Sequence, residues 1–418
     1  MNKSYIEETQ LATGPLVVSH AMPEAQSVAL GIFVDVGSRD ETVAQAGITH
    51  ALEHMLFKGT RELDVHQLAI RLDALGGNAN AYTSRERTCF HLHVLHEQWR
   101  EALGLLSSMV LEPALPAAEW QRERDVIISE MAMVDDTPEE WVMDQHVTAL
   151  FAGQAVGQPV LGTPESLGGV TRDDLAAYLG HWYRPPRMLI AAAGRIDHAE
   201  LVEAVANWNW PAGAESAGRE KARICGGVQV LARDFEQAQL VLSLPGIVAT
   251  SEARPQAWIA NQILGGGMSS RLFSEVREKR GLAYSVGSHL SMLTDTGSWT
   301  VTCGTSPEHA GSCVDLIGEV LGRLPDSLDE AEVARARQQL EVQLRMGMDS
   351  VEGQMLYLGG RLDEAKLLTP MQWIERIRTV DVDTLRDWIG ARLAEGRLWT
   401  VAAPEAALAG ICDRLPQC

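Results

Sequence analysis

His50-Ala51-Leu52-Glu53-His54 places two imidazoles and one carboxylate within five residues of sequence. In a helix, residues three and four positions apart lie on one face, so His50, Glu53 and His54 would point the same way. A catalytic zinc ion takes three protein ligands and leaves one position for water. The stretch therefore predicts a helix that supplies two zinc ligands, with Glu53 placed to take a proton from that water. The alternative is a pair of partly buried histidines with Glu53 bonded to a neighbour.

The segments around this motif alternate between strand and helix patterns. Apolar alternation predicts strands at 15–19 and 26–36, the second with Val28, Leu30, Ile32, Val34 and Val36 on one face. The motif helix is predicted from about Ala44 to Phe57, where Lys58-Gly59-Thr60 ends it. Further strands are predicted at 80–84, 88–95 and 188–193, and further helices at 66–75, 98–110, 117–134, 138–151, 172–183 and 199–208.

The second half of the chain repeats this order of elements. It follows the polar segment 211–223, which has the composition of a linker. Strands are predicted at 239–244, 283–290 and 298–304, and helices at 255–264, 270–279, 309–324 and 330–346. An offset of 213 positions matches Ala118 to Ala331 and Met133 to Met346, which indicates an internal repeat. Since 418 residues exceed one ordinary core, we expect two homologous domains, 1–210 and 224–418, joined by the linker 211–223.

The two copies differ where a metal ion would need ligands. With the offset of 213, Glu123 falls on Ala336 and Glu130 falls on Gln343. With a weaker offset of 207, the three motif residues fall on Ala257, Ala260 and Asn261. Only the first copy has the polar set, so the third ligand is sought among Glu123 and Glu130, seven positions apart on one helix face. The alternative is that both are exposed helix carboxylates.

The composition of the chain indicates which kinds of partner it can bind and in which cellular compartment it is expected. A net charge of −21 argues against sequence-independent binding of nucleic acid and leaves basic or neutral polypeptides as partners. No apolar run is long enough to cross a bilayer, and the first residues contain no secretion signal, so we expect a cytoplasmic protein without a membrane partner. The six cysteines form no Cys-x-x-Cys pair, which favours reduced thiols that serve as packing residues.

Several stretches together resemble the inverted-zincin metallopeptidases, the family of pitrilysin, insulin-degrading enzyme and mitochondrial processing peptidase. The resemblance covers nearly the whole chain and is closest to the short bacterial branch that is similar to processing peptidase. In the first half it is carried by Gly37-Ser38-Arg39-Asp40-Glu41, by Gly47-Ile48-Thr49 with the motif and Met55, and by Phe57-Lys58-Gly59-Thr60. In the second half it is carried by Arg277-Glu278-Lys279-Arg280-Gly281-Leu282-Ala283-Tyr284.

The resemblance implies a role for each residue that matches the family pattern. His50, His54 and Glu130 would be the zinc ligands, Glu53 the general base, and Glu123 a glutamate that supports the site without binding zinc. Asn80, Ala81 and Tyr82 would belong to a substrate-facing edge strand, to which a peptide adds as a further strand; the alternative is an ordinary buried hairpin. Arg277 and Tyr284 would come across a cavity and bind the substrate carbonyl near the zinc ion.

The resemblance also implies a fold and an activity. It implies an α+β fold of two homologous domains, each a mostly antiparallel sheet packed with helices, which form half of a clamshell chamber. The expected activity is that of a zinc endopeptidase, with one Zn²⁺ per chain, acting on peptides or unfolded polypeptide segments. A homodimer is expected, and a heterodimer with a homologue that lacks the motif is the alternative. The competing class is a non-catalytic assembly or core subunit of a larger complex.

Overall fold

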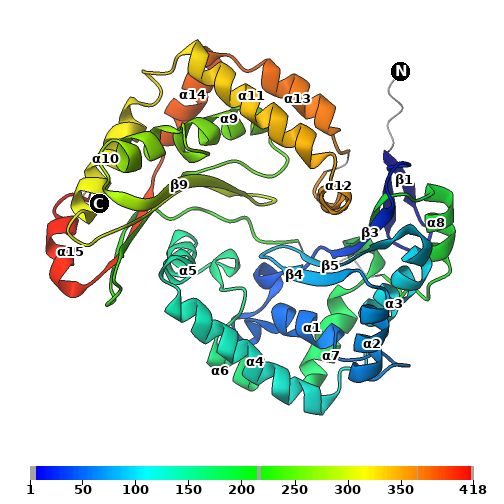
Figure 1. Ribbon diagram of the computed structural model, residues 1–418. Coiled ribbons are helices and arrows are strands. Elements are labelled where there is room, and N and C mark those ends of the chain that lie inside the picture. The colour runs from blue at the N-terminus through cyan, green and yellow to red at the C-terminus, as the bar shows by residue number, and fades with distance from the viewer. Residues whose placement is uncertain (1–5, 214–217, 365, 416–418) are drawn as a thin grey trace. The chain divides into compact units, whose positions relative to one another are not determined.

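The computed structural model describes residues 6–213, 218–364 and 366–415, and these divide into two compact units (Figure 1). The first unit comprises Met1–Met131, Gln158–Arg219 and Met346–Thr369, and the second comprises Ala132–Gly157, Glu220–Arg345 and Pro370–Cys418. This division differs from two consecutive domains, because one segment of each half belongs to the unit formed mainly by the other half. Residues 214–217 of the expected linker, residues 1–5 and Cys418 lie outside the described residues.

A six-stranded sheet forms the centre of the first unit, in the order β1-β2-β6-β3-β5-β4. Its neighbouring strands are antiparallel except for β2 and β6, which are parallel. The strands are β1 Ile6–Gln10, β2 Leu16–Ala21, β3 Ser27–Val34, β4 Asn78–Thr83, β5 Thr88–Leu95 and β6 Met188–Gly194. β3 pairs Val28 with Val94 of β5 and with Gly194 of β6, so it lies in the middle of the sheet.

Both faces of this sheet are buried, each by a different group of helices. The alternating residues predicted for β3, Val28 to Val36, pack into the larger core with α1 Ile48–Leu56, α3 Trp99–Leu111 and α7 Arg172–Trp182. Ala29 and Phe33 point to the opposite face, where they belong to one buried cluster with Met355 and Leu358 of α12 Val351–Leu358, a helix from the second half of the chain. A Cβ added at Gly31 would lie 2.5 Å from the sulfur of Met355, so glycine permits the close approach of α12.

The remaining helices of the first half are α2 Val65–Ala74, α4 Ala117–Asp136, α6 Pro164–Gly169 and α8 His198–Ala206. The long helix α4 begins in the first unit and ends in the second, whose boundary falls between Met131 and Ala132. It is followed by α5 Pro138–Leu150, which belongs to the second unit.

The second unit is built on a five-stranded sheet in the order β7-β11-β8-β10-β9. Here β7 and β11 are parallel and the other pairs are antiparallel, as in the corresponding part of the first sheet. The strands are β7 Gly227–Ala232, β8 Ala238–Pro245, β9 Ala283–Met292, β10 Gly297–Thr305 and β11 Leu398–Ala403. The helices are α9 Arg254–Gly265, α10 Ala310–Arg323, α11 Glu330–Gly347, α13 Pro370–Arg378, α14 Val382–Leu393 and α15 Glu405–Cys412, with a π-helix at Phe273–Glu278.

Helix α5 covers the face of this second sheet in the same way that α12 covers the first. Val142 packs against Val241 and Ala402, and the buried ring of His146 is hydrogen-bonded to Thr400 Oγ1 at 2.8 Å and to Ser243 Oγ at 2.7 Å. Each sheet is therefore closed by a helix from the other half of the sequence. The α+β prediction, with two similar and mostly antiparallel sheets, is confirmed.

Several details differ from the sequence predictions. The motif helix begins at Ile48, four residues after the predicted start, and Val43–Gln45 form a separate 3₁₀ turn. The helix predicted at 270–279 contains the π-helix Phe273–Glu278. Among the described cysteines Cys89, Cys303 and Cys313 are buried, Cys225 is half-buried, Cys412 is exposed, and all are free thiols. In the described part of the chain, every helix is too short or too polar to cross a membrane.

Candidate metal centre

The first turn of α1 fixes where the motif residues point. Gly47 immediately precedes the helix with φ of 90°, and a Cβ there would lie 2.5 Å from the carbonyl oxygen of Leu161. Only glycine tolerates both conditions, so the helix cannot begin earlier. The residues that enter the core from α1 are Ile48, Ala51, Leu52, Met55 and Leu56. Burial of this apolar face leaves His50, Glu53 and His54 on the other side of the helix, as their spacing predicts.

His50, His54 and Glu130 converge, with one ligand atom of each lying within 4.8 Å of the others. The Nε2 atoms of His50 and His54 lie 3.9 Å and 3.6 Å from the same Oε2 atom of Glu130. Among the described residues, this is the one group of three histidine, cysteine or acidic side chains with such spacing. Adjacent ligands of a tetrahedral zinc ion with bonds of roughly 2.0–2.1 Å stand about 3.4 Å apart. The donor set and its spacing therefore fit a zinc ion.

Glu123 lies behind His54 and not among the converging ligand atoms. Its Oε2 atom lies 3.0 Å from Nδ1 of His54, and its Oε1 atom accepts a hydrogen bond of 2.8 Å from Lys58 Nζ. Burial acts to raise the pKa of Glu123, but the hydrogen bonds from Lys58 and His54 outweigh it and lower that pKa. An ionised carboxylate can only accept, so Nδ1 of His54 carries the proton and Nε2 presents its lone pair toward Glu130.

His50 is held in its neutral form. Burial is the main cause that lowers the pKa of His50 to about 4. A neutral imidazole is the form that binds a metal ion. Its Nδ1 atom is buried and has no hydrogen-bond partner in the described part of the chain, while Nε2 faces Glu130.

Glu53 lies beside the ligand set and is bonded to the edge of the sheet. Thr83, the last residue of β4, donates its hydroxyl hydrogen to Glu53 Oε2. Burial raises the pKa of Glu53, and this outweighs the opposing effect of the Thr83 hydrogen bond. A carboxylate with a raised pKa takes up a proton more readily, which suits a general base.

Strand β4 carries Asn80, Ala81 and Tyr82 at the edge of the first sheet. Among the strands of the described residues, β5 is its one pairing partner, on one side. The side chains of Asn80 and Tyr82 are exposed, whereas Ala81 packs against the core. In the described part of the chain, the outer edge of β4 is thus unpaired, and β4 contacts α1. The strand ends at Thr83, the residue that contacts Glu53.

Arg277 and Tyr284 form a pair within the second unit. Arg277 is in the π-helix, and its guanidinium carbon lies 5.6 Å from the centre of the Tyr284 ring and 4.8 Å from that of Phe273. Tyr284, the second residue of β9, is 77% exposed. The structure thus brings five of the predicted residues together in the first unit and these two together in the second.

Two polar partners of this site were not predicted from the sequence. The sequence indicates Lys58 only as part of the segment that ends the helix, and Thr83 only as a residue of a strand. Lys58 stands four positions after His54, so helical spacing could have indicated that the two share partners. The contact between Thr83 and Glu53 joins residues 30 positions apart, and no local pattern indicates it.

The fold and the site define a two-unit α+β protein with a candidate metal centre on a His-x-x-Glu-His helix. Residues 16–164 match the family model described as insulinase (peptidase family M16), and residues 169–340 match the peptidase M16 inactive domain. A protein of Streptomyces coelicolor named as an uncharacterized zinc protease is 35% identical over 393 residues, 91% of this chain and 86% of the relative. One of Bacillus subtilis with the same description is 34% identical over 82% of this chain and 84% of the relative. The chain belongs to peptidase family M16.

Solved structures show the same fold at lower sequence identity. A protease from Helicobacter pylori has a TM-score of 0.91 at 19% identity and covers 96% of this chain and 100% of that one. A chain of Complex III2 from Candida albicans has a TM-score of 0.84 at 20% identity, with 95% of each chain covered.

Proposed function

We propose that this protein is a zinc-dependent endopeptidase that hydrolyses peptide bonds in unfolded peptides or protein segments. The observation that carries the proposal is the convergence of His50, His54 and Glu130 with Glu53 beside them. Relatives that match more than four fifths of the chain are named zinc proteases, which supports the same class. The ligands His50, His54 and Glu130 would hold one zinc ion per chain.

The chain's own residues account for the proton transfers. When bound, zinc polarises a peptide carbonyl and lowers the pKa of a water molecule. Glu53 takes the proton of the attacking water and then passes it to the nitrogen of the leaving amine. Thr83 holds Glu53 Oε2 through its hydroxyl, and Glu123 holds the His54 ring with Nε2 directed at Glu130.

Substrate binding would use main-chain hydrogen bonds along β4. A peptide that adds to this free edge would form a further antiparallel strand, with side-chain contacts from Asn80 and Tyr82. Only an extended chain can do so, which favours unfolded segments over folded proteins. In this proposal, Arg277 and Tyr284 donate hydrogen bonds to the substrate carbonyl oxygen as negative charge develops on it. The two units would form half of an enclosed chamber, completed by a second copy of the chain in a homodimer, with a heterodimer as the alternative.

The test of the activity is cleavage of a quenched basic peptide by the wild type and by Glu53→Gln, with zinc measured in both. The glutamine is isosteric and keeps a hydrogen bond with Thr83, so zinc binding should persist. The rate should fall by about 10²–10⁴-fold because the general base is lost. Full activity of the zinc-loaded Glu53→Gln protein would contradict the assignment.

A second candidate is a non-catalytic subunit of a larger complex, which the likeness to a chain of Complex III2 favours. In that case, purified protein would bind no zinc, would cleave no peptide and would associate with partner chains. The complete set of His50, Glu53, His54 and Glu130 favours the enzyme.

A further inference from the structure

The N-terminal end of α1 is held by a carboxylate from outside the helix. Gly47, the N-cap residue, has no side chain to accept a hydrogen bond. Instead, Glu41 Oε2 accepts from the backbone N–H of Gly47 at 2.7 Å, and Glu41 Oε1 accepts from that of Thr49 at 2.8 Å. Glu41 is only 4% exposed. A carboxylate at a helix N-terminus satisfies unpaired N–H groups and interacts favourably with the helix dipole.

A second layer of hydrogen bonds fixes this carboxylate in place. The Thr49 side chain is hydrogen-bonded to Glu41, and its Oγ1 atom lies 2.8 Å from the hydroxyl oxygen of Tyr178 in α7. Burial raises the pKa of Glu41, whereas the hydrogen bonds from Thr49 and Gly47 act against this shift. The two N–H groups bonded by Glu41 belong to residues on the N-terminal side of His50, so the position of Glu41 determines where His50 stands.

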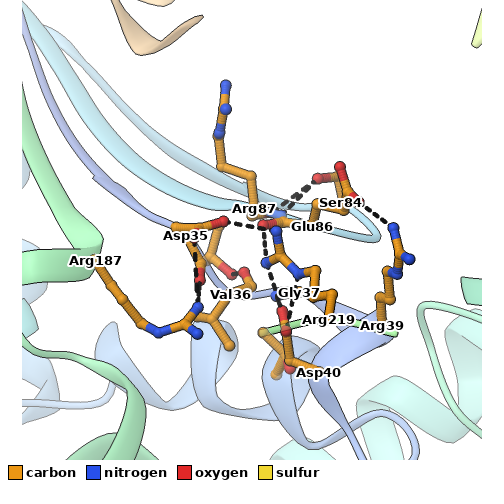
Figure 2. A network of polar contacts seen from close by, with 12 residues as sticks. Asp35, Val36, Gly37, Arg39, Asp40, Ser84, Glu86, Arg87, Arg187 and Arg219 are labelled. Atoms are coloured by element: carbon orange, nitrogen blue, oxygen red, sulfur yellow. Dashed lines mark hydrogen bonds and ion pairs between the residues drawn. The ribbon is translucent and has the colours of Figure 1, made fainter. Parts of the chain in front are cut away.

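The residue before Glu41 connects the same turn to Arg219, where the chain makes one of its crossings from the first unit to the second. Asp40 accepts hydrogen bonds from Arg219, at 2.9 Å from Nε and 2.7 Å from Nη2, and from the backbone N–H of Gly37 at 3.0 Å (Figure 2). Arg219 also pairs with Asp35 at 2.8 Å and donates to the carbonyl oxygen of Glu86 at 3.0 Å (Figure 2). Arg219 is the last residue of its segment in the first unit, and Glu220 begins the next segment of the second.

We propose that Glu41 is a positioning residue for the metal-binding helix, and that Arg219, acting through Asp40, couples this position to one of the points where the chain crosses between the two units. The inference rests on the proposed zinc site. The two Nε2 atoms lie only 3.6–3.9 Å from Glu130 Oε2, so a small rotation of the first turn of α1 changes whether all three donors can reach one ion. Loss of residues that orient metal ligands weakens metal affinity by about 10–100-fold.

The test replaces Glu41 by glutamine in the full-length chain. The amide supplies one acceptor, and its NH₂ group faces one of the two backbone N–H donors, so one of them loses its partner. We expect zinc affinity, measured by competition with a chelator, to fall by about 10-fold or more. The visible absorption bands of the Co²⁺-substituted protein should also change, because they report the geometry of the ligands.

A matched control separates positioning from general stability. Asp64 caps the neighbouring helix α2 by accepting from the N–H of Gln67 at 2.8 Å, and α2 carries none of the ligands. Asp64→Ala should lower the melting temperature while leaving zinc affinity and the Co²⁺ spectrum unchanged. If Glu41→Gln does not fold, Glu41→Asp carries the test, since it keeps the charge but shortens the reach by one methylene.

The coupling to this crossing point is tested by Arg219→Gln, with Arg187→Gln as its control. Arg187 lies in the same network and bonds Asp35, but it is not among the partners of Asp40 (Figure 2). Arg219→Gln should weaken zinc binding in the same direction as Glu41→Gln, and Arg187→Gln should not. Wild-type zinc affinity in both Glu41→Gln and Arg219→Gln would overturn the inference. A wild-type protein that binds no zinc would instead contradict the proposed function.

Discussion

Helix α1 with the larger part of α4, in the first unit, and α9 with the larger part of α11, in the second, occupy comparable places but carry different residues. α1 lies beside the edge strand β4, and α9 lies beside the edge strand β9. Where the first unit has His50 and Glu53, the matching positions of α9 are the fully buried Ala257 and Ala260. Where α4 buries Glu123 at 7% exposure, α11 buries Ala336 at 3%.

The comparison shows which residues the fold needs and which residues only the candidate metal site needs. In the second unit, Asn261 stands at the position of His54, and its side-chain oxygen accepts hydrogen bonds from Trp299 Nε1 and Ser288 Oγ. Its polar group is thus used within the packed unit. In the first unit, the corresponding positions hold histidine and glutamate side chains whose nitrogen and oxygen atoms lie 3.0–3.9 Å apart. The scaffold forms with either set, so the histidines and glutamates of the first unit are not needed to build it.

The largest effect is expected when the first unit is given the residue of the second. His54→Asn removes one ligand, so zinc should be lost and peptide cleavage should fall to background. The free energy of unfolding of the metal-free protein should change little, because the second unit accommodates asparagine at this place. Zinc content by mass spectrometry, cleavage assays and urea unfolding test this. Retained zinc would exclude His54 as a ligand.

The two glutamates of α4 should respond differently to the same change. Glu130→Gln should lose zinc, since Oε2 of Glu130 is the atom that both imidazoles face. Glu123→Gln should keep most of its zinc at saturating metal, with affinity reduced by about 10–100-fold, because Glu123 only orients His54. Titration of each variant with zinc measures this, and the reverse order of effects would exchange the two roles.

Removal of the Thr83 hydroxyl should reduce the rate without removing the metal. Thr83→Val keeps the shape of the side chain but leaves Glu53 Oε2 without this donor. The value of kcat should fall by about tenfold while zinc content stays the same, because the general base is less well oriented. Thr83→Ser keeps the hydroxyl and serves as the control. Equal rates for the valine and serine variants would show that the contact has no catalytic role.

The helix that covers the second sheet should make stability depend on pH. Burial, together with the charge of His289, lowers the pKa of His146 to about 4, below its ordinary value of 6.5. The folded state therefore resists protonation that the unfolded state accepts. The contribution of neutral His146 to the free energy of unfolding should be complete above pH 6.5. It should be lost as the pH drops from 6.5 to 4, which lowers the free energy of unfolding by on the order of 3 kcal/mol. Urea unfolding across this range, with His146→Gln as the control, measures it; an equal slope in the variant would exclude His146 as the cause.

The sequence predicts local features of the site well and its tertiary contacts poorly. The common face of His50, Glu53 and His54 follows from helical spacing alone, and the alternation of Val28 to Val36 correctly predicts the inward face of β3. Glu123 and Glu130 were found through the repeat, because only one copy has them. The contact between Thr83 and Glu53, the cap by Glu41 and the exchange of α5 and α12 join distant segments. The periodicity of apolar residues within a segment cannot predict contacts between segments that are distant in sequence.

Helix ends show the same limit on a smaller scale. The motif helix is predicted to start at about Ala44, whereas it starts at Ile48, directly after Gly47, which adopts a φ of 90°. A glycine in the sequence permits that conformation but does not require it. In the packed fold, a Cβ at residue 47 would lie 2.5 Å from the carbonyl oxygen of Leu161, so a larger residue is excluded there.

X-ray absorption at the zinc edge of the purified wild-type protein, together with the number of zinc ions per chain, tests the candidate metal centre most directly. We expect one zinc ion per chain, with a ligand shell of two imidazole nitrogens and oxygen atoms, as His50, His54 and Glu130 would provide. A shell that contains sulfur, or a shell without imidazole, would contradict it. So would a fully active protein without zinc.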